Sequence, residues 1–193
     1  MSDPLSQGMA GSARVMMGHA DGLNRIDGTS RGVWTSLWGV AFALAMGLLG
    51  SARFHAIGGT DGEERETLAQ ALVSDAFSTT LAHAAGLALV LVFARARPER
   101  FGLYTAAINW SWAVLSAVLL VPFLVFWSAV ARQGANGALD GATALFLLAI
   151  VVIGIVARYR VVRIVFEMDR SRAASIAGGA FIVEQMVIAG LAT

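Results

Sequence analysis

Glu184 is the residue whose type and surroundings could most readily do chemistry. It lies in the apolar run 181–187, and an ionisable group at the centre of a bilayer costs about 2.5–3.5 kcal/mol, so it normally faces protein and has a partner. Asp75, Thr79 and His83 could supply one, because their i, i+4, i+8 spacing places them on one helical stripe. Counted from the ends of their apolar runs, His83 and Glu184 lie at the same depth. We therefore predict that these two side chains approach each other, directly or through one water.

This intramembrane polar pair has two interpretations. In the first, Glu184, His83 and Asp75 form a proton or cation path. In the second, Glu184 is protonated or hydrogen-bonded and fixes the packing of helices. We favour the second, because a path of three groups in so small a bundle lacks a second half.

The residue types do not indicate enzymatic chemistry. The chain has no Cys, which excludes a thiolate nucleophile, a disulfide and a Cys-ligated metal. One membrane-embedded His excludes a bis-His haem within one chain, and no Ser-x-x-Lys, His-Glu-x-x-His or phosphate-binding glycine loop occurs. A metal site of His55 with the acidic residues of 61–66 is a less favoured alternative to a solvated, acid-capped helix start. We expect no catalytic residue, metal or cofactor.

The elements that must position these residues are long apolar runs. Of the 193 residues, 57% are hydrophobic and 14% are charged, and the charges lie mostly between the runs. About 20 apolar residues suffice to cross a bilayer as a helix. The runs are 33–57, 71–94, 103–130, 141–157 (166 as the alternative end) and 173–193. This pattern predicts an all-α polytopic membrane protein with five transmembrane helices in one domain, 33–193.

The first 32 residues are more polar and form a predicted cytoplasmic N-terminal segment. Apolar residues recur within 5–24 at near-helical spacing, which favours a helix lying in the membrane interface. A loosely ordered tail is the alternative, because four glycines in this stretch would weaken a helix.

The distribution of arginine predicts how the chain is threaded. All fourteen basic residues are Arg, and short loops that are rich in Arg are retained on the cytoplasmic side of the membrane. The N-terminal segment and the second and fourth loops hold eleven: Arg14, Arg25, Arg31, Arg95, Arg97, Arg100, Arg158, Arg160, Arg163, Arg170 and Arg172. The opposite side holds Arg53, Arg65 and Arg132. We therefore expect a bacterial inner-membrane protein with a cytoplasmic N-terminus and a periplasmic C-terminus.

Two further groups of residues have predicted roles at the membrane. Small residues at four-residue spacing favour close helix packing; these are Gly39, Ala43 and Gly47 in the first run, and Ser78, Ala82 and Gly86 in the second. The arginines of the fourth loop could bind anionic lipid headgroups, or they could serve only to enforce the threading. These arginines are Arg158, Arg160, Arg163, Arg170 and Arg172.

Two segments carry a resemblance to a known family. RID at 25–27 leads into GVWTSLW at 32–38, and YRVVR at 159–163 precedes Ala173, Ala174 and an acid in the last run. This pattern resembles small alphaproteobacterial membrane proteins grouped with the Yip1 type, which implies five spans and a cytoplasmic N-terminus. The chain lacks the Asp-Leu-x-Gly-Pro signature of eukaryotic members. Their GTPase partners and trafficking roles are therefore not carried over, and no functional residue transfers.

These observations favour a non-catalytic accessory or scaffold component of a larger membrane assembly. Its expected partners are the lipid bilayer and either another membrane protein or copies of itself. The net charge of +1 gives no basic field for nucleic acid. The alternative is a small proton- or cation-coupled transporter that uses Glu184 and His83.

Overall fold

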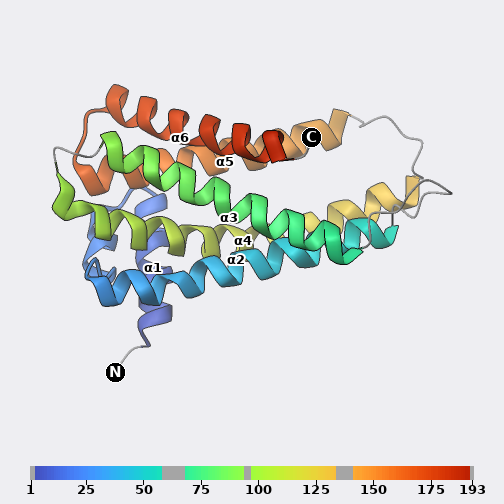
Figure 1. Ribbon diagram of the computed structural model, residues 1–193, viewed down its shortest axis with the longest axis horizontal. Helices are drawn as coiled ribbons and strands as arrows, with labels where there is room; N and C mark the ends of the chain where they lie inside the picture. Colours follow the sequence, from blue (N-terminus) through green and yellow to red (C-terminus); the bar gives the residue numbers. More distant parts are fainter. Residues whose placement is uncertain (1–2, 58–67, 94–96, 134–140, 192–193) are drawn as a thin grey trace.

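The computed structural model describes residues 3–57, 68–93, 97–133 and 141–191, all within helices, turns and short connections. Its helices are α1 (Pro4–Met16), α2 (Ser30–Ile57), α3 (Leu68–Phe93), α4 (Phe101–Gln133), α5 (Gly141–Phe166) and α6 (Arg170–Leu191), with short 3-10 helices η1 (Ala20–Arg25) and η2 (Pro98–Arg100) (Figure 1). The described residues contain no strand, which confirms the all-α prediction. The predicted alternative metal site lies outside the described part of the chain, because the side chain of His55 and the residues 61–66 are not described.

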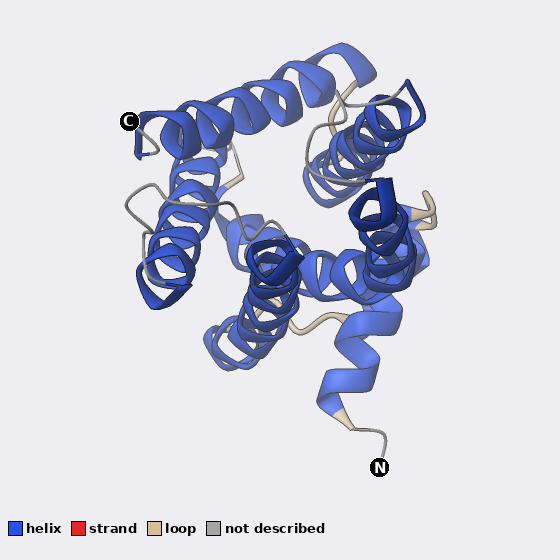
Figure 2. Cartoon of the chain, turned by 90° about the vertical axis from the view of Figure 1, so that its right-hand side faces the viewer, coloured by secondary structure: helices blue, strands red, loops and turns tan. Residues whose placement is uncertain are grey.

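Helices α2 to α6 are each long and apolar enough to cross a membrane. The fourth span continues to Phe166, which was the alternative end. These helices run side by side, whereas α1 lies across one end of the bundle (Figure 1). In the bundle, α2 packs mainly on α4, α3 packs on α6, and α5 contacts both α4 and α6. Figure 2 views the bundle from the end away from α1. The protein is therefore a helical membrane protein.

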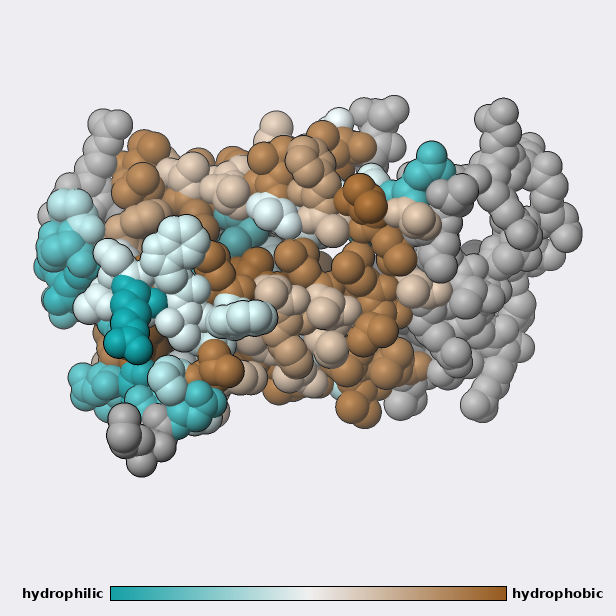
Figure 3. Space-filling model, turned by 60° about the horizontal axis from the view of Figure 1, so that its bottom comes forward, coloured by the Kyte–Doolittle hydropathy of each residue, from teal (hydrophilic) through white to brown (hydrophobic). Residues whose placement is uncertain are grey.

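The surface of the bundle fits a lipid environment. An apolar band covers the middle of the face in Figure 3, and hydrophilic residues gather at the end that carries α1. Trp34 and Trp38 are 72% and 68% exposed near the start of α2. Tyr and Trp favour the headgroup level because each combines an apolar body with a polar tip, so this end of the bundle has the composition of a membrane interface.

The N-terminal segment folds as a docked helix rather than as a loose tail. Asp3 caps α1 by accepting a hydrogen bond from the backbone N–H of Leu5. Gly8 brings the backbone of α1 against the indole of Trp110, where a Cβ atom would overlap the ring. Ser12 is fully buried and donates to the Ala107 carbonyl at 3.0 Å. The glycine here permits close contact with α4, which outweighs its weak helix propensity.

The connection between α5 and α6 is short and fixed at both ends. Glu167 ends α5 in the left-handed region at φ 50°, and Met168 N–H donates back to the Arg163 carbonyl at 3.2 Å, as in a Schellman turn. Asp169 then caps α6 by accepting from the backbone N–H of Arg172 at 2.9 Å. This tight turn makes α5 and α6 antiparallel neighbours.

Arginines from the α3–α4 connection hold this turn in place. Arg97 and Arg100 each contact the Glu167 carboxylate at 2.7 Å, and together they hold the pKa of Glu167 below its usual value. Arg100 also donates to the Val165 carbonyl at 2.7 Å, where a cation is favourable at a helix C-terminus. The turns at 97–100 and 166–170 therefore lie at the same end of the bundle as α1 (Figure 1).

Candidate functional site: a polar cluster inside the bundle

The centre of the site is an ion pair between neighbouring helices. Arg158 of α5 donates from its two terminal nitrogens to the two carboxylate oxygens of Glu184 in α6, each at 2.6 Å. The two side chains are only 8% and 9% exposed. Two parallel N–H···O bonds match the planar guanidinium to the carboxylate, which is the strongest geometry for such a pair.

The antiparallel arrangement of α5 and α6 explains how these residues meet. Arg158 lies about 12 Å before the end of α5, and Glu184 lies about 21 Å after the start of α6, at 1.5 Å of rise per residue. A helical side chain leans toward the N-terminus of its own helix. The two side chains therefore lean toward each other and close the difference in depth.

A second set of bonds joins α2, α3 and α4. His83 Nε2 lies 2.9 Å from Asn109 Oδ1, Asn109 Nδ2 donates to Ser36 Oγ at 2.9 Å, and Ser36 donates to a backbone carbonyl of its own helix at 2.6 Å. Because an amide oxygen only accepts, His83 carries its proton on Nε2 in this arrangement. Asn109 and Ser36 are fully buried, so these bonds satisfy polar groups that water does not reach.

The predicted direct contact between His83 and Glu184 is wrong, because each has another partner. The two residues nevertheless lie on facing helices. Gly86, one turn after His83 on α3, lies against the Glu184 carboxylate, where a Cβ atom would overlap Oε1. The ring of Trp112 lies 4.1 Å from that of His83 and also lines a pocket of about 150 Å³ beside Arg158 and Glu184. A water-mediated approach stays a prediction.

Arg158 does not belong with the arginines predicted to bind lipid headgroups. Its side chain is buried, 7% exposed, and pairs with α6. It also lies two turns before the end of α5, so it is inside the bundle rather than in the loop. The signal was present in the sequence: Arg158 shares the i, i+3, i+4, i+7 face of Val161, Val162 and Val165, which are all fully buried. Sequence reasoning also missed Asn109 and Ser36, since neutral polar residues are common in membrane helices.

The other four arginines of that predicted group lie near the α5–α6 turn. Arg160 is half-buried and donates to the Met16 carbonyl of α1 at 2.7 Å. Arg163, Arg170 and Arg172 are exposed. These positions leave their predicted role at a lipid surface open.

The small-residue stripes contact different helices, not each other. Gly39 lies against the Asn109 carbonyl of α4, and Ala43 beside it is 8% exposed. On α3, Ser78 is half-buried and Ala82 is 2% exposed, and Gly86 meets α6 as described. The first stripe thus packs on α4, and the second turns toward α6.

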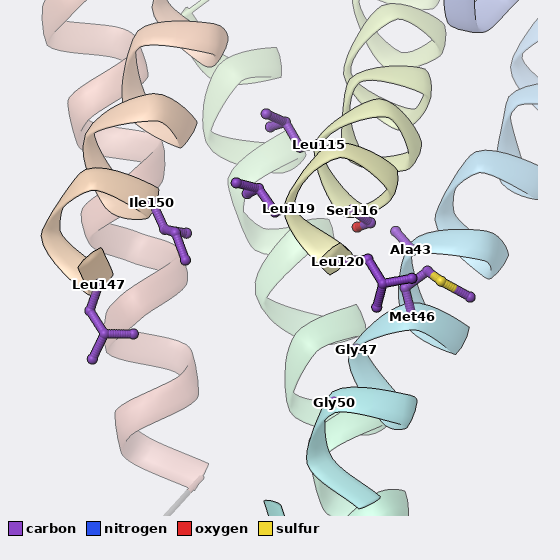
Figure 4. Close-up of a pocket in the computed structure, with 10 residues that line it drawn as sticks. All are labelled: Ala43, Met46, Gly47, Gly50, Leu115, Ser116, Leu119, Leu120, Leu147 and Ile150. Atoms are coloured by element: carbon purple, nitrogen blue, oxygen red, sulfur yellow. The ribbon is translucent and has the colours of Figure 1, made fainter. Parts of the chain in front are cut away.

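Gly47 does not make the predicted helix contact. It is exposed, and a Cβ atom added to it would have no neighbour within 4 Å. It lines a pocket of about 310 Å³ between α2, α4 and α5, where Met46 and Leu120 lie near it while Leu147 of α5 stands well apart (Figure 4). Periodicity selected the right face of α2 as far as Ala43, but no helix lies against the Gly47 backbone at this level.

Asp75 and Thr79 lie away from the ion pair. Together with Ser116 and Trp112 they line a pocket of about 250 Å³ between α2, α3 and α4. Trp112 borders both this pocket and the one beside Glu184. Asp75 itself is exposed.

No protein-family model, curated protein or solved structure matches this chain. The resemblance to Yip1-type proteins therefore stays a prediction, and function must be argued from the polar cluster itself. That cluster comprises Ser36, His83, Asn109, Arg158 and Glu184, one side chain from each of the five spans. Its two sets of bonds fix which helices are neighbours, one joining α5 to α6 and the other joining α2 and α3 to α4.

Proposed function

We propose that this protein is a non-catalytic accessory or scaffold component of a bacterial inner membrane, built to present a fixed helical surface to other membrane components. The observation that carries the proposal is the bidentate pairing of Glu184 with Arg158. Both carboxylate oxygens are already bonded to one buried cation. Adding a proton to Glu184 would leave that cation without its counterion in a region that water hardly reaches, which is costly.

The surface available to a partner is apolar and extends over all five spans. On α5 and α6 the exposed large side chains include Leu145, Leu148, Val152, Ile182 and Met186, each between 48% and 68% exposed. Lipid chains or another membrane helix can cover such a surface equally well on hydrophobicity alone. A fixed bundle gives this surface a constant shape, which is what an accessory subunit or a self-associating protein requires.

The proposed orientation has the α1 end of the bundle in the cytoplasm. The arginine-bearing turns at 97–100 and 166–170 share that end with α1. Arginine is retained on the cytoplasmic side during insertion, so the spatial grouping of these segments supports the threading inferred from the sequence. The N-terminus is then cytoplasmic and the C-terminus periplasmic.

A charge-free double variant tests the proposal. We expect Arg158→Met with Glu184→Met to keep the bundle folded, because apolar residues of similar volume can replace a buried ion pair. A scaffold should then co-purify in mild detergent with the same membrane chains, or with copies of itself, as the wild type does. A wild-type protein that purifies as a lone monodisperse monomer would count against the scaffold.

The second candidate is a small proton- or cation-coupled transporter using Glu184 and His83. One observation favours it: His83 Nδ1 is buried and has no hydrogen-bond partner in the described part of the chain. A transporter should show pH-dependent flux in proteoliposomes, and the charge-free double variant should lose that flux while staying folded. Flux that survives in the double variant, or is absent from the wild type, rejects this candidate.

A further inference from the structure

A groove between α4 and α5 lies directly below the C-terminal end of α1. Its volume is about 440 Å³. Its walls are aliphatic and come from Val114, Leu115 and Val118 of α4 and Val152, Ile153 and Val156 of α5. Val118 and Val152 are 64% and 48% exposed, so the groove opens sideways, where the surroundings of a membrane span are lipid chains.

One end of the groove lies under α1 and carries a single charged side chain. Ala13 and Met16 of α1, with Met17 just after it, cover this end, and Arg160 is the one charged residue that lines the groove. Arg160 uses one N–H for the Met16 carbonyl, whereas a guanidinium has five N–H donors. It lies about 9 Å before the end of α5 at 1.5 Å per residue, at the level where α1 crosses the bundle.

We propose that this groove binds one phospholipid with an anionic headgroup. The phosphate accepts hydrogen bonds from the free donors of Arg160, and one acyl chain lies along the aliphatic walls. Two properties select this occupant. An apolar groove within the hydrocarbon region is filled by hydrocarbon rather than by water, and a guanidinium at its headgroup end matches the geometry of a phosphate. The lipid would then join α1, α4 and α5.

The test is lipid retention by the full chain, measured by native mass spectrometry. The probes are phosphatidylglycerol and phosphatidylcholine with identical acyl chains, added to detergent-purified protein. We expect the wild type to keep one phosphatidylglycerol and to prefer it over phosphatidylcholine about fivefold, roughly the effect of one arginine facing a net negative headgroup rather than one whose phosphate is offset by a cationic choline. Millimolar inorganic phosphate should not displace it, because a free anion lacks the chain that fills the groove.

Three variants separate a built site from a charged surface. Arg160→Gln should abolish the preference, whereas Arg163→Gln, which removes an exposed charge three residues further along α5, should not. Val152→Trp fills the groove with Arg160 intact and should lose bound lipid of either headgroup. Equal loss in Arg160→Gln and Arg163→Gln, or one lipid still bound to Val152→Trp, overturns the proposal.

Arg160→Gln could also lose lipid because it weakens the contact between Arg160 and α1, so a further variant tests this effect separately. Arg160→Lys keeps the charge and can still donate to the Met16 carbonyl, so it should retain at least part of the preference. If Arg160→Lys loses the preference completely although its thermal unfolding matches the wild type, phosphate recognition by charge at this position is wrong. The scaffold proposal is independent of this result, since it is read from co-purifying chains rather than from lipid.

Discussion

Breaking the Arg158–Glu184 pair on one side should destabilise the protein far more than removing it altogether. In Glu184→Gln the amide can accept one N–H from the guanidinium, but its own NH₂ group faces the other. One of the two 2.6 Å bonds is then lost, and the cation stays in a site where its side chain is 8% exposed. Leaving one member of a buried pair uncompensated costs about 3–5 kcal/mol. We take the lower value, since one bond survives.

A loss of about 3 kcal/mol is more than a hundredfold in the unfolding equilibrium. We expect the double variant, Arg158→Met with Glu184→Met, to lie within about 1 kcal/mol of the wild type, because removing both charges also removes the desolvation cost. The coupling energy of the pair is the stability change of the double variant minus the sum of the changes in Arg158→Met and Glu184→Met measured alone. Gln185→Ala, at an exposed neighbour on α6, is the matched control and should change stability little.

The assay is reversible unfolding of purified protein in mixed micelles with increasing sodium dodecyl sulfate, followed by far-ultraviolet circular dichroism. The reasoning is refuted if Glu184→Gln is as stable as the wild type. It is also refuted if the double variant is less stable than either single variant, because the two losses would then add and each residue would stabilise the protein independently of the other.

Four other variants test the packing around the cluster and the turn between α5 and α6. Gly86→Ala should cost about 1–3 kcal/mol because its Cβ would overlap the Glu184 carboxylate, whereas Gly47→Ala, with open space around it, should be neutral or slightly stabilising; equal effects in the same unfolding assay would contradict this. Asn109→Leu should cost about 2–3 kcal/mol, since it leaves the buried His83 ring without its hydrogen-bond partner and removes the donor to Ser36 Oγ; an unchanged unfolding midpoint would show that these bonds are dispensable. The arginines lower the pKa of Glu167 from its usual value of 4.5, so the stability that Glu167 contributes to the fold is present above pH 4.5 and is lost as the pH falls through the lowered pKa. Glu167→Gln should remove this part of the pH dependence of stability. A pH profile of stability identical to that of the wild type would refute the assignment.

The sequence predicted the fold well because the apolar runs follow from the thickness of the bilayer. Five runs of sufficient length required five helices, and even the longer end of α5 was one of two stated alternatives. The burial of Glu184 and His83 also follows from depth alone, since both lie near the middle of their runs and are 7% and 6% exposed. Depth along a helix is thus readable from a single sequence.

The partner of each buried group was not readable, because it depends on which helices are neighbours and how they tilt. Arg158 looked like part of a charged loop, although its side chain reaches across to α6. Gly47 looked like a packing residue, although α5 stands too far away to meet it. Gly8 looked like a helix breaker, although its missing side chain allows α1 to dock on Trp110. These distances between helices are properties of the bundle and not of any one run.

The central claim is that five helices cross a membrane with the α1 end of the bundle in the cytoplasm. Because the chain has no Cys, single cysteines placed at two exposed sites, Asn24 in η1 and Ala69 at the start of α3, give unambiguous labels. In intact cells whose outer membrane admits the reagent, a membrane-impermeant maleimide should label Ala69→Cys and should label Asn24→Cys only after the inner membrane is opened. Labelling of both sites from the same side, or of Asn24→Cys alone in intact cells, would contradict the account.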